Sequence, residues 1–173
     1  MYHVNGAIYT GDFIDGKRHG NGNLVQANGN KFTGHFIDNK RQGQGTFEWV
    51  NNGNRYVGSY VNDKEHGNGV FYHGNGDRYE GEFVDGKKQG NGVLFHQNGN
   101  KYTGNWFEGK RHGQGTFEWT NGNRYMGAYI DNKEQGFGVF THHNGEKYEG
   151  EWSAGKRHGS GVLTKPDKTT IHG

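Results

Sequence analysis

The chain has 173 residues, a formal net charge of +2 and only 28% hydrophobic residues. So few aliphatic side chains are typical of disordered proteins, but the 14% of aromatic residues and the low net charge indicate a folded chain. Because there is no cysteine, disulfides and Cys-ligated zinc are excluded. No apolar run reaches the length of a signal peptide or a membrane-spanning helix, and the scattered charge gives no basic footprint for nucleic acid.

A 23-residue period organises the chain from end to end. Residues 1–8 align with the second half of a unit, and seven whole units follow at 9–31, 32–55, 56–78, 79–101, 102–124, 125–147 and 148–170. Residues 171–173 begin a further unit, and the pair Asn51-Asn52 makes the second unit one residue longer. We therefore expect one repeat array over residues 1–173. Because both ends fall inside a unit, we also expect a piece of a longer array.

Each unit carries the same residue types at fixed positions. Position 1 is aromatic and is occupied in turn by Tyr9, Phe32, Tyr56, Tyr79, Tyr102, Tyr125 and Tyr148. Position 5 is also aromatic, position 9 is lysine, and positions 3, 12 and 14 are glycine in every unit. The 34 glycines beside a single proline fit neither collagen nor a flexible linker. They are placed for backbone geometry.

The alternation of residue types predicts hairpins. Positions 1, 3 and 5, and then 12, 14, 16 and 18, alternate with polar residues as one face of a strand does. We place a four-residue turn at positions 9–12 and a three-residue return at positions 20–22. This register sets position 5 opposite position 16, and sets positions 16 and 18 opposite positions 3 and 1 of the next unit. Rings at positions 5 and 16 then cover glycines across the strand.

The fold class predicted by this pattern is all-β. We expect an elongated, single-layer, twisted antiparallel sheet of tandem 23-residue β-hairpin repeats, with about 14 short strands and no long helix. At about 4.8 Å per strand, the seven units would form a rod about 65–70 Å long. The edge strand at Tyr2 to Val4 has no protecting residue, whereas we expect Pro166 to protect the other edge.

The repeat resembles a known family. The segment from Tyr102 to Gly115 reads Tyr-Thr-Gly-Asn-Trp-Phe-Glu-Gly-Lys-Arg-His-Gly-Gln-Gly, which is similar to the MORN (membrane occupation and recognition nexus) consensus. Asn39, Asp63 and Asn132 replace the consensus glycine at position 8. The resemblance implies a non-catalytic scaffold. Some members are associated with acidic phospholipids, several hold partner segments along an aromatic groove, and some dimerise through terminal repeats.

Motifs that carry chemistry are weak in this sequence. The stretch from Gly11 to Lys17 fits part of a phosphate loop, but Arg18 stands where serine or threonine is needed. Histidines of alternate units are about 19 Å apart, too far to share one zinc ion. No constellation unique to one unit suggests catalysis. We expect no enzyme activity, no cofactor and no metal in this chain. The alternative that it is the repeat region of a larger enzyme stays open.

The ring-bearing face is the predicted binding site. Exposed aromatic strips are typical of protein-binding surfaces. We expect a protein partner, cytoskeletal or membrane-associated, to lie on the residues Phe47, Trp49, Trp106, Phe117, Trp119 and Trp152. Residues that break the repeat, such as His35 and the segment 50–52, are candidates for specificity. The predicted location is cytoplasmic, with cytoskeletal, ciliary or peripheral-membrane assemblies as options.

Acidic phospholipid is the alternative ligand. The position-9 lysines are its possible contacts, namely Lys17, Lys40, Lys64, Lys87, Lys110, Lys133 and Lys156. Basic residues at position 10, such as Arg111, are expected to line the same long edge of the sheet. Acidic residues two positions before several of the lysines offset their charge, which is more typical of a solubilising rim. The sequence also leaves open a homodimer formed through the terminal repeats.

Overall fold

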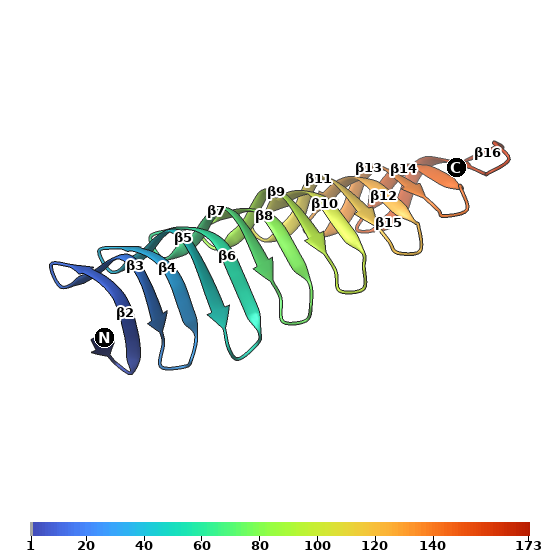
Figure 1. Cartoon of the computed structure of the whole chain (residues 1–173). Helices are drawn as coiled ribbons and strands as arrows, with labels where there is room; N and C mark the ends of the chain where they lie inside the picture. Colours follow the sequence, from blue (N-terminus) through green and yellow to red (C-terminus); the bar gives the residue numbers. More distant parts are fainter. Residues whose placement is uncertain (1) are drawn as a thin grey trace. The chain divides into compact units, whose positions relative to one another are not determined.

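The structure, a computed structural model, describes residues 2–173, and all regular elements in that range are β-strands (Figure 1). The chain divides into two compact units, with the boundary between Lys87 and Lys88; we keep the word unit for these two and call each 23-residue repeat a hairpin. The first unit contains β1 (Tyr2–Val4), β2 (Ala7–Ile14), β3 (Lys17–Val25), β4 (Lys31–Ile37), β5 (Lys40–Trp49), β6 (Asn54–Val61), β7 (Lys64–Tyr72) and β8 (Arg78–Val84). The second unit contains β9 (Lys87–Phe95), β10 (Lys101–Phe107), β11 (Lys110–Glu118), β12 (Arg124–Ile130), β13 (Lys133–Thr141), β14 (Lys147–Ser153), β15 (Lys156–Thr164) and β16 (Thr170–His172).

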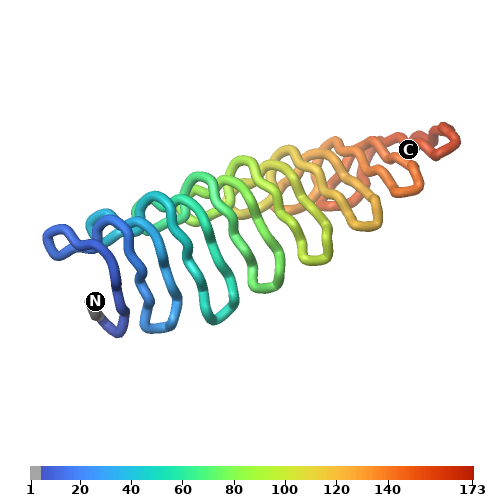
Figure 2. Tube along the Cα trace, in the orientation of Figure 1, coloured from blue at the N-terminus to red at the C-terminus, as the bar shows by residue number. Residues whose placement is uncertain are grey.

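Within each unit the strands form one antiparallel layer. Each strand pairs with the next strand of the sequence, as in β10 with β11 and β11 with β12. Short turns lie along one edge of the layer and longer loops along the other (Figure 2). The predicted all-β sheet of 23-residue hairpin repeats is thus confirmed. Pro166, in contrast, lies in the loop before the edge strand β16, so the prediction that it protects this edge was wrong.

The tight turn of each hairpin occupies positions 7 and 8. In the hairpin of β10 and β11, Phe107 pairs with Lys110, so that only Glu108 and Gly109 form the turn. Their φ angles are +50° and +82°. Two successive positive φ angles are the requirement of a type I′ turn, whose twist matches that of the flanking strands. The predicted turn at positions 9–12 was therefore wrong, since Lys110 already lies in the strand.

The pairing register also differs from the prediction. Tyr102 pairs with Phe117 and Trp106 with Arg111, so position 1 faces position 16 and position 5 faces position 10. On the other side, Phe117 pairs with Tyr125, which is position 16 against position 1 of the next hairpin. The predicted pairs of 5 with 16 and of 16 with 3 were wrong. The difference is an even number of residues, so each side chain still lies on the predicted face.

A β-bulge in the second strand, opposite position 4 of the first, explains the change of register within each hairpin. The ladder of β10 and β11 shifts between Gly104 and Trp106, which leaves Asn105 without a ladder partner on β11. The Tyr102 hydroxyl donates a hydrogen bond to the Asn105 carbonyl oxygen at 3.0 Å. The tyrosine at position 1 does the same in five further hairpins, where the acceptors are the carbonyls of Asp12, Ser59, Glu82, Ala128 and Glu151. Only the second hairpin, which begins with Phe32, lacks this hydroxyl.

The core of each unit consists of rings that cover glycines. Tyr102 is fully buried, and a Cβ added to Gly115 would overlap its ring. A Cβ at Gly104 would lie 2.5 Å from the Gly115 Cα across the strands. Ring-over-glycine packing is thus confirmed, but its main ring is at position 1 instead of positions 5 and 16. A sheet of one layer can bury a core in this way because the glycines let the rings lie against the backbone.

Candidate binding groove

The predicted groove residues fall into two groups with different roles. Trp106 and Trp152 are 4% and 8% exposed, and their indole N–H groups donate to the carbonyls of Gly92 and Gly138, each at 3.3 Å. Phe47 and Phe117 are also buried. These four rings form the floor of the sheet, and their removal would open the core.

Trp49 and Trp119 stand over that floor and remain partly exposed. In the second unit, Trp119 lies 4.5 Å from Phe117 and 5.4 Å from Phe140, measured between ring centroids. Trp49 makes the equivalent contacts in the first unit, 4.4 Å from Phe47 and 5.5 Å from Phe71. Each unit therefore has a ladder of stacked rings along positions 16 and 18 of successive hairpins.

Histidines extend both ladders, and the sequence analysis did not single them out. His142 lies 4.7 Å from Phe140, His96 lies 5.9 Å from Phe117, and His73 lies 4.6 Å from Phe71. All three occupy position 18, which is also the position of Trp49 and Trp119. The shared position was the signal that could have revealed them. We use the name aromatic ladder for Phe47, Trp49, Phe71 and His73 in the first unit and His96, Phe117, Trp119, Phe140 and His142 in the second.

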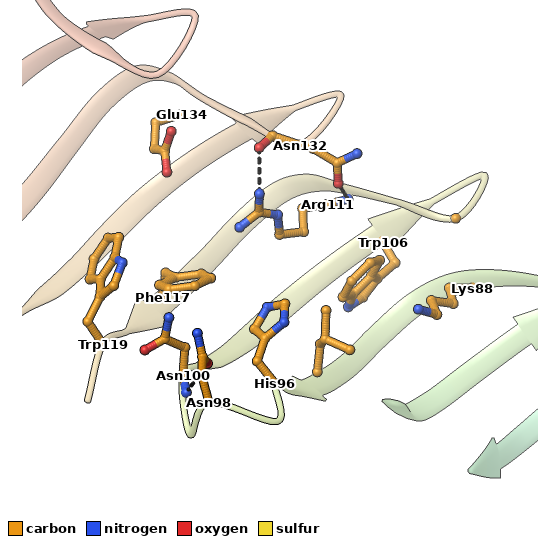
Figure 3. Close-up of a pocket in the computed structure, with 12 residues that line it drawn as sticks. Lys88, His96, Asn98, Asn100, Trp106, Arg111, Phe117, Trp119, Asn132 and Glu134 are labelled. Carbon is orange, nitrogen blue, oxygen red and sulfur yellow. Dashed lines mark hydrogen bonds between the residues drawn. The ribbon is translucent and has the colours of Figure 1, made fainter. Parts of the chain in front are cut away.

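A pocket of about 580 Å³ opens over the ladder of the second unit (Figure 3). Charged, amide and aromatic side chains converge on it from β9, β10, β11 and β13 and from the adjoining loops. Its lining residues are Lys88, Leu94, His96, Asn98, Asn100, Trp106, Gly109, Arg111, Phe117, Trp119, Asn132 and Glu134.

Arg111 lies inside this groove, so the prediction that it lines the edge of the sheet was wrong. Its guanidinium carbon is 5.2–5.5 Å from the ring centroids of Tyr102, Phe117 and Tyr129, within the range of cation–π attraction. Its Nη2 donates to the Asn132 carbonyl at 2.8 Å, and its backbone N–H donates to Asn132 Oδ1 at 2.9 Å. The next hairpin thus holds the arginine over the rings.

This contact explains the departures from the consensus at position 8. We call it the Arg–Asx joint; its three instances are Arg18–Asn39, Arg41–Asp63 and Arg111–Asn132. Where position 10 carries Glu65, Lys88 or Glu134 instead of arginine, the next hairpin has glycine at position 8. There the glycine only donates its backbone N–H, as Gly109 does to the Lys88 carbonyl at 2.9 Å.

The position-9 lysines lie at the tight turns, away from the groove. Lys17, Lys64 and Lys110 form ion pairs with Asp38, Asp85 and Asp131 at 3.9, 3.9 and 3.3 Å. Each aspartate belongs to the next hairpin, so the acids that offset the lysines are not those two residues earlier in the sequence. These pairs are exposed, and each contributes little to the free energy of unfolding.

Tyrosines beneath the groove keep their protons. Burial raises the pKa of Tyr102 to about 12, although the nearby Arg111 opposes part of this shift. The pKa of Tyr129 is also raised, first by burial and then by the charge of Glu134. The Tyr102 hydroxyl therefore remains a donor to Asn105 at neutral pH. Among the described residues there is no cluster of three potential metal ligands and no helix that could span a membrane.

Comparison with known proteins agrees with this geometry. The fold and the repeated rings and glycines define a β-hairpin repeat protein. The MORN repeat pattern matches residues 9–31, 32–54, 56–78, 79–101, 102–124, 125–147 and 148–170. The chain therefore belongs to the MORN repeat family. No curated protein matches it significantly over its sequence.

Solved structures share the fold at low sequence identity. The TCP domain of SAS-4 (dCPAP) from Drosophila melanogaster, in complex with a proline-rich motif of Ana2, superimposes with a TM-score of 0.57 and 12% identity. The match covers 89% of this chain and 83% of that chain. The TCP10c domain of Drosophila melanogaster Sas-4 gives a TM-score of 0.51 and 13% identity, covering 88% of this chain and 91% of that one.

Proposed function

We propose that the chain is a non-catalytic scaffold that holds an extended segment of a protein partner on its aromatic ladder. The observation that carries the proposal is the partly exposed, continuous row of rings in each unit, centred on Trp49 and on Trp119. A single layer leaves the outer surface of such rings without a second layer to cover it. Rigid aromatic side chains are the usual anchors of protein interfaces.

The likeness to the SAS-4 TCP domain supports an extended partner. That domain has a similar sheet and is in complex with a proline-rich motif. Proline-rich segments adopt polyproline II structure and dock on aromatic grooves without a large loss of conformational entropy. In this proposal the partner belongs to a cytoplasmic, cytoskeletal or ciliary assembly, as the resemblance to MORN proteins suggests.

The test is a selection of peptides that bind the whole chain. Random dodecapeptides are displayed, selected on the chain, and then measured on two variants. The first, Trp49→Ala with Trp119→Ala, removes the exposed rings of both ladders while Trp106 and Trp152 keep the floor closed. The second, Phe107→Ala with Ile130→Ala, removes apolar side chains that are 52% and 50% exposed from the opposite face.

Selected peptides should bind the ladder variant about tenfold more weakly and the control variant unchanged, since one buried anchor is typically worth more than 1 kcal/mol. Circular dichroism and thermal unfolding confirm that each variant folds. Peptides that bind the ladder variant as tightly as the unaltered chain, or a selection that yields no binder, would exclude this function.

Acidic phospholipid is a second candidate, and one observation favours it. At the tight turns an exposed apolar residue pairs across the strands with a lysine, as Phe107 does with Lys110 and Ile130 with Lys133. Apolar tips beside basic charge are the composition of surfaces that enter a membrane interface. The ion pairs of Lys17, Lys64 and Lys110 weaken this candidate.

Vesicles containing phosphatidylserine test the lipid candidate. The variant Lys40→Gln, Lys133→Gln, Lys156→Gln removes three charges that have no carboxylate within ion-pair distance in the described part of the chain. If the tips bind lipid, this variant sediments less with the vesicles, and binding falls as salt rises. Sedimentation that is equal for both proteins and insensitive to salt would remove the candidate.

A further inference from the structure

The position-10 side chains give the groove the same order of charges in both units. In the first unit this position carries Arg18, Arg41 and Glu65 in successive hairpins. In the second unit it carries Lys88, Arg111, Glu134 and Arg157, and the first three line the pocket of Figure 3. The first three hairpins with a position-10 residue in each unit therefore present two basic side chains followed by an acidic one, and the second unit adds a further arginine.

Within each unit the two basic side chains flank one buried ring. The Lys88 ammonium lies 5.2 Å from the Trp106 ring centroid, and Arg111 is the cross-strand neighbour of Trp106. In the first unit Arg18 lies 5.2 Å from the Phe36 centroid, and Arg41 is the cross-strand neighbour of Phe36. We use the name seat for this arrangement of one buried ring between two basic side chains, and the two seats are built alike.

The seats differ in the group that holds their second basic side chain. Arg41 has a carboxylate partner, because its Nε lies 3.2 Å from Asp63 Oδ1. Arg111 makes the same backbone and side-chain contacts with Asn132, at 2.9 and 2.8 Å, but the amide is neutral. No carboxylate lies within ion-pair distance of Arg111 among residues 2–173. The charge of Arg111 thus stays uncompensated by its joint, whereas the Asp63 carboxylate neutralises Arg41.

We propose, resting on the function above, that the pocket of the second unit selects a partner segment with an aspartate or glutamate. Its carboxylate lies between Lys88 and Arg111 over Trp106, where charge-assisted hydrogen bonds to the guanidinium are available. Successive hairpins are about 9.6 Å apart, since each adds two strands of about 4.8 Å. Glu134 is therefore about 14 Å from a carboxylate midway between Lys88 and Arg111, a span of about four extended residues of 3.3 Å, so a basic partner residue four positions away faces Glu134.

Reciprocal changes at position 8 test this inference with little risk to the fold. Asn132→Asp copies the Arg41–Asp63 joint into the second unit and so neutralises Arg111 with a geometry that the chain already uses. Asp63→Asn copies the other joint into the first unit and serves as the matched control. Both variants, together with Trp119→Ala, are measured against the peptides selected on the unaltered chain.

The selected peptides should be rich in Asp or Glu with Lys or Arg about four residues away. They should bind Asn132→Asp about tenfold more weakly, bind Asp63→Asn at least as tightly, and lose affinity when their acid is changed to the amide. Peptides that need Trp119 but lack acidic residues, or bind Asn132→Asp equally, would overturn the inference and leave the scaffold function standing. Peptides that ignore both Trp119 and Asn132 would overturn both. Loss of phosphatidylserine vesicles, instead of peptides, from Asn132→Asp would assign the seat to a lipid and likewise overturn it.

Discussion

The tyrosine hydroxyls of this sheet have unequal roles, although most of their rings are equally buried. Tyr56 donates to the Ser59 carbonyl at 3.1 Å, the carbonyl that the bulge removes from the ladder. Tyr60 is as deeply buried, but its hydroxyl has no hydrogen-bond partner among the described residues. A buried donor without a partner costs free energy, whereas a paired one contributes about 1 kcal/mol. The two residues therefore make a matched pair for mutation.

We predict that Tyr56→Phe lowers the free energy of unfolding by about 1 kcal/mol. Tyr60→Phe should leave it unchanged or raise it slightly, because phenylalanine already fills position 5 at Phe36. Urea unfolding of both variants measures the difference. Equal losses in the two variants would contradict the assignment of the Tyr56 hydroxyl to the bulge.

In the second hairpin, a hydroxyl can be added instead of removed. Phe32 packs over Gly34 and Gly45 as the tyrosines of the other hairpins do, but it has no hydroxyl for the His35 carbonyl. Phe32→Tyr should raise the free energy of unfolding by about 0.5–1 kcal/mol, read from the same urea transitions. Tyr9→Phe, which deletes the equivalent bond to the Asp12 carbonyl in the first hairpin, should move the transition in the opposite direction. A destabilised Phe32→Tyr variant would mean that the bulge carbonyl is not within reach.

At the scale of the hairpin, glycine allows the rings to lie directly against the backbone of the neighbouring strands. Gly115→Ala would place a Cβ into the Tyr102 ring, and we predict a loss of about 1–3 kcal/mol from overpacking. Gly16→Asn is the control: Gly16 has open space around it and a φ of +72°, and Asn39 holds the same position at the same φ. Thermal unfolding should show a large shift for the first variant and almost none for the second. A tolerated alanine at residue 115 would show that the ring can move aside.

Within the hairpin, the faces of the strands could be predicted from the sequence, but the pairing register could not. The 23-residue period and the faces of the strands follow from alternation alone, so Trp49 and Trp119 could be placed on the ring-bearing face. The register could not, because glycines at positions 12 and 14 resemble turn residues as strongly as those at position 8. The true turn depends on positive φ at residues such as Asp131 and Asn132, which composition does not mark uniquely. Arg111 was misplaced for the same reason, since its position over the rings depends on that turn.

For the whole molecule, the 23-residue period of the sequence predicts an extended outline. Seven hairpins at about 4.8 Å per strand would give a rod about 65–70 Å long. A compact chain of this length would have a radius of gyration near 16 Å. We expect small-angle scattering to give a clearly larger value, with a pair-distance distribution that has the long tail of a rod. A value at or below 16 Å would refute the extended outline.

The Arg–Asx joint sets rules for splicing, because it decides which hairpins can be neighbours. Removal of residues 79–101 would bring Glu65 beside Gly109, a combination equivalent to the present Glu65 and Gly86. Removal of residues 102–124, also one hairpin repeat, would bring Lys88 beside Asn132 and leave the asparagine without its arginine. We predict that the first deletion unfolds at a higher temperature than the second, by a few degrees, the amount expected from about 1 kcal/mol. Equal melting temperatures would mean that the hairpins are freely interchangeable. If the difference is found, an array of this kind can be lengthened or shortened only at junctions where position 10 of one hairpin is compatible with position 8 of the next.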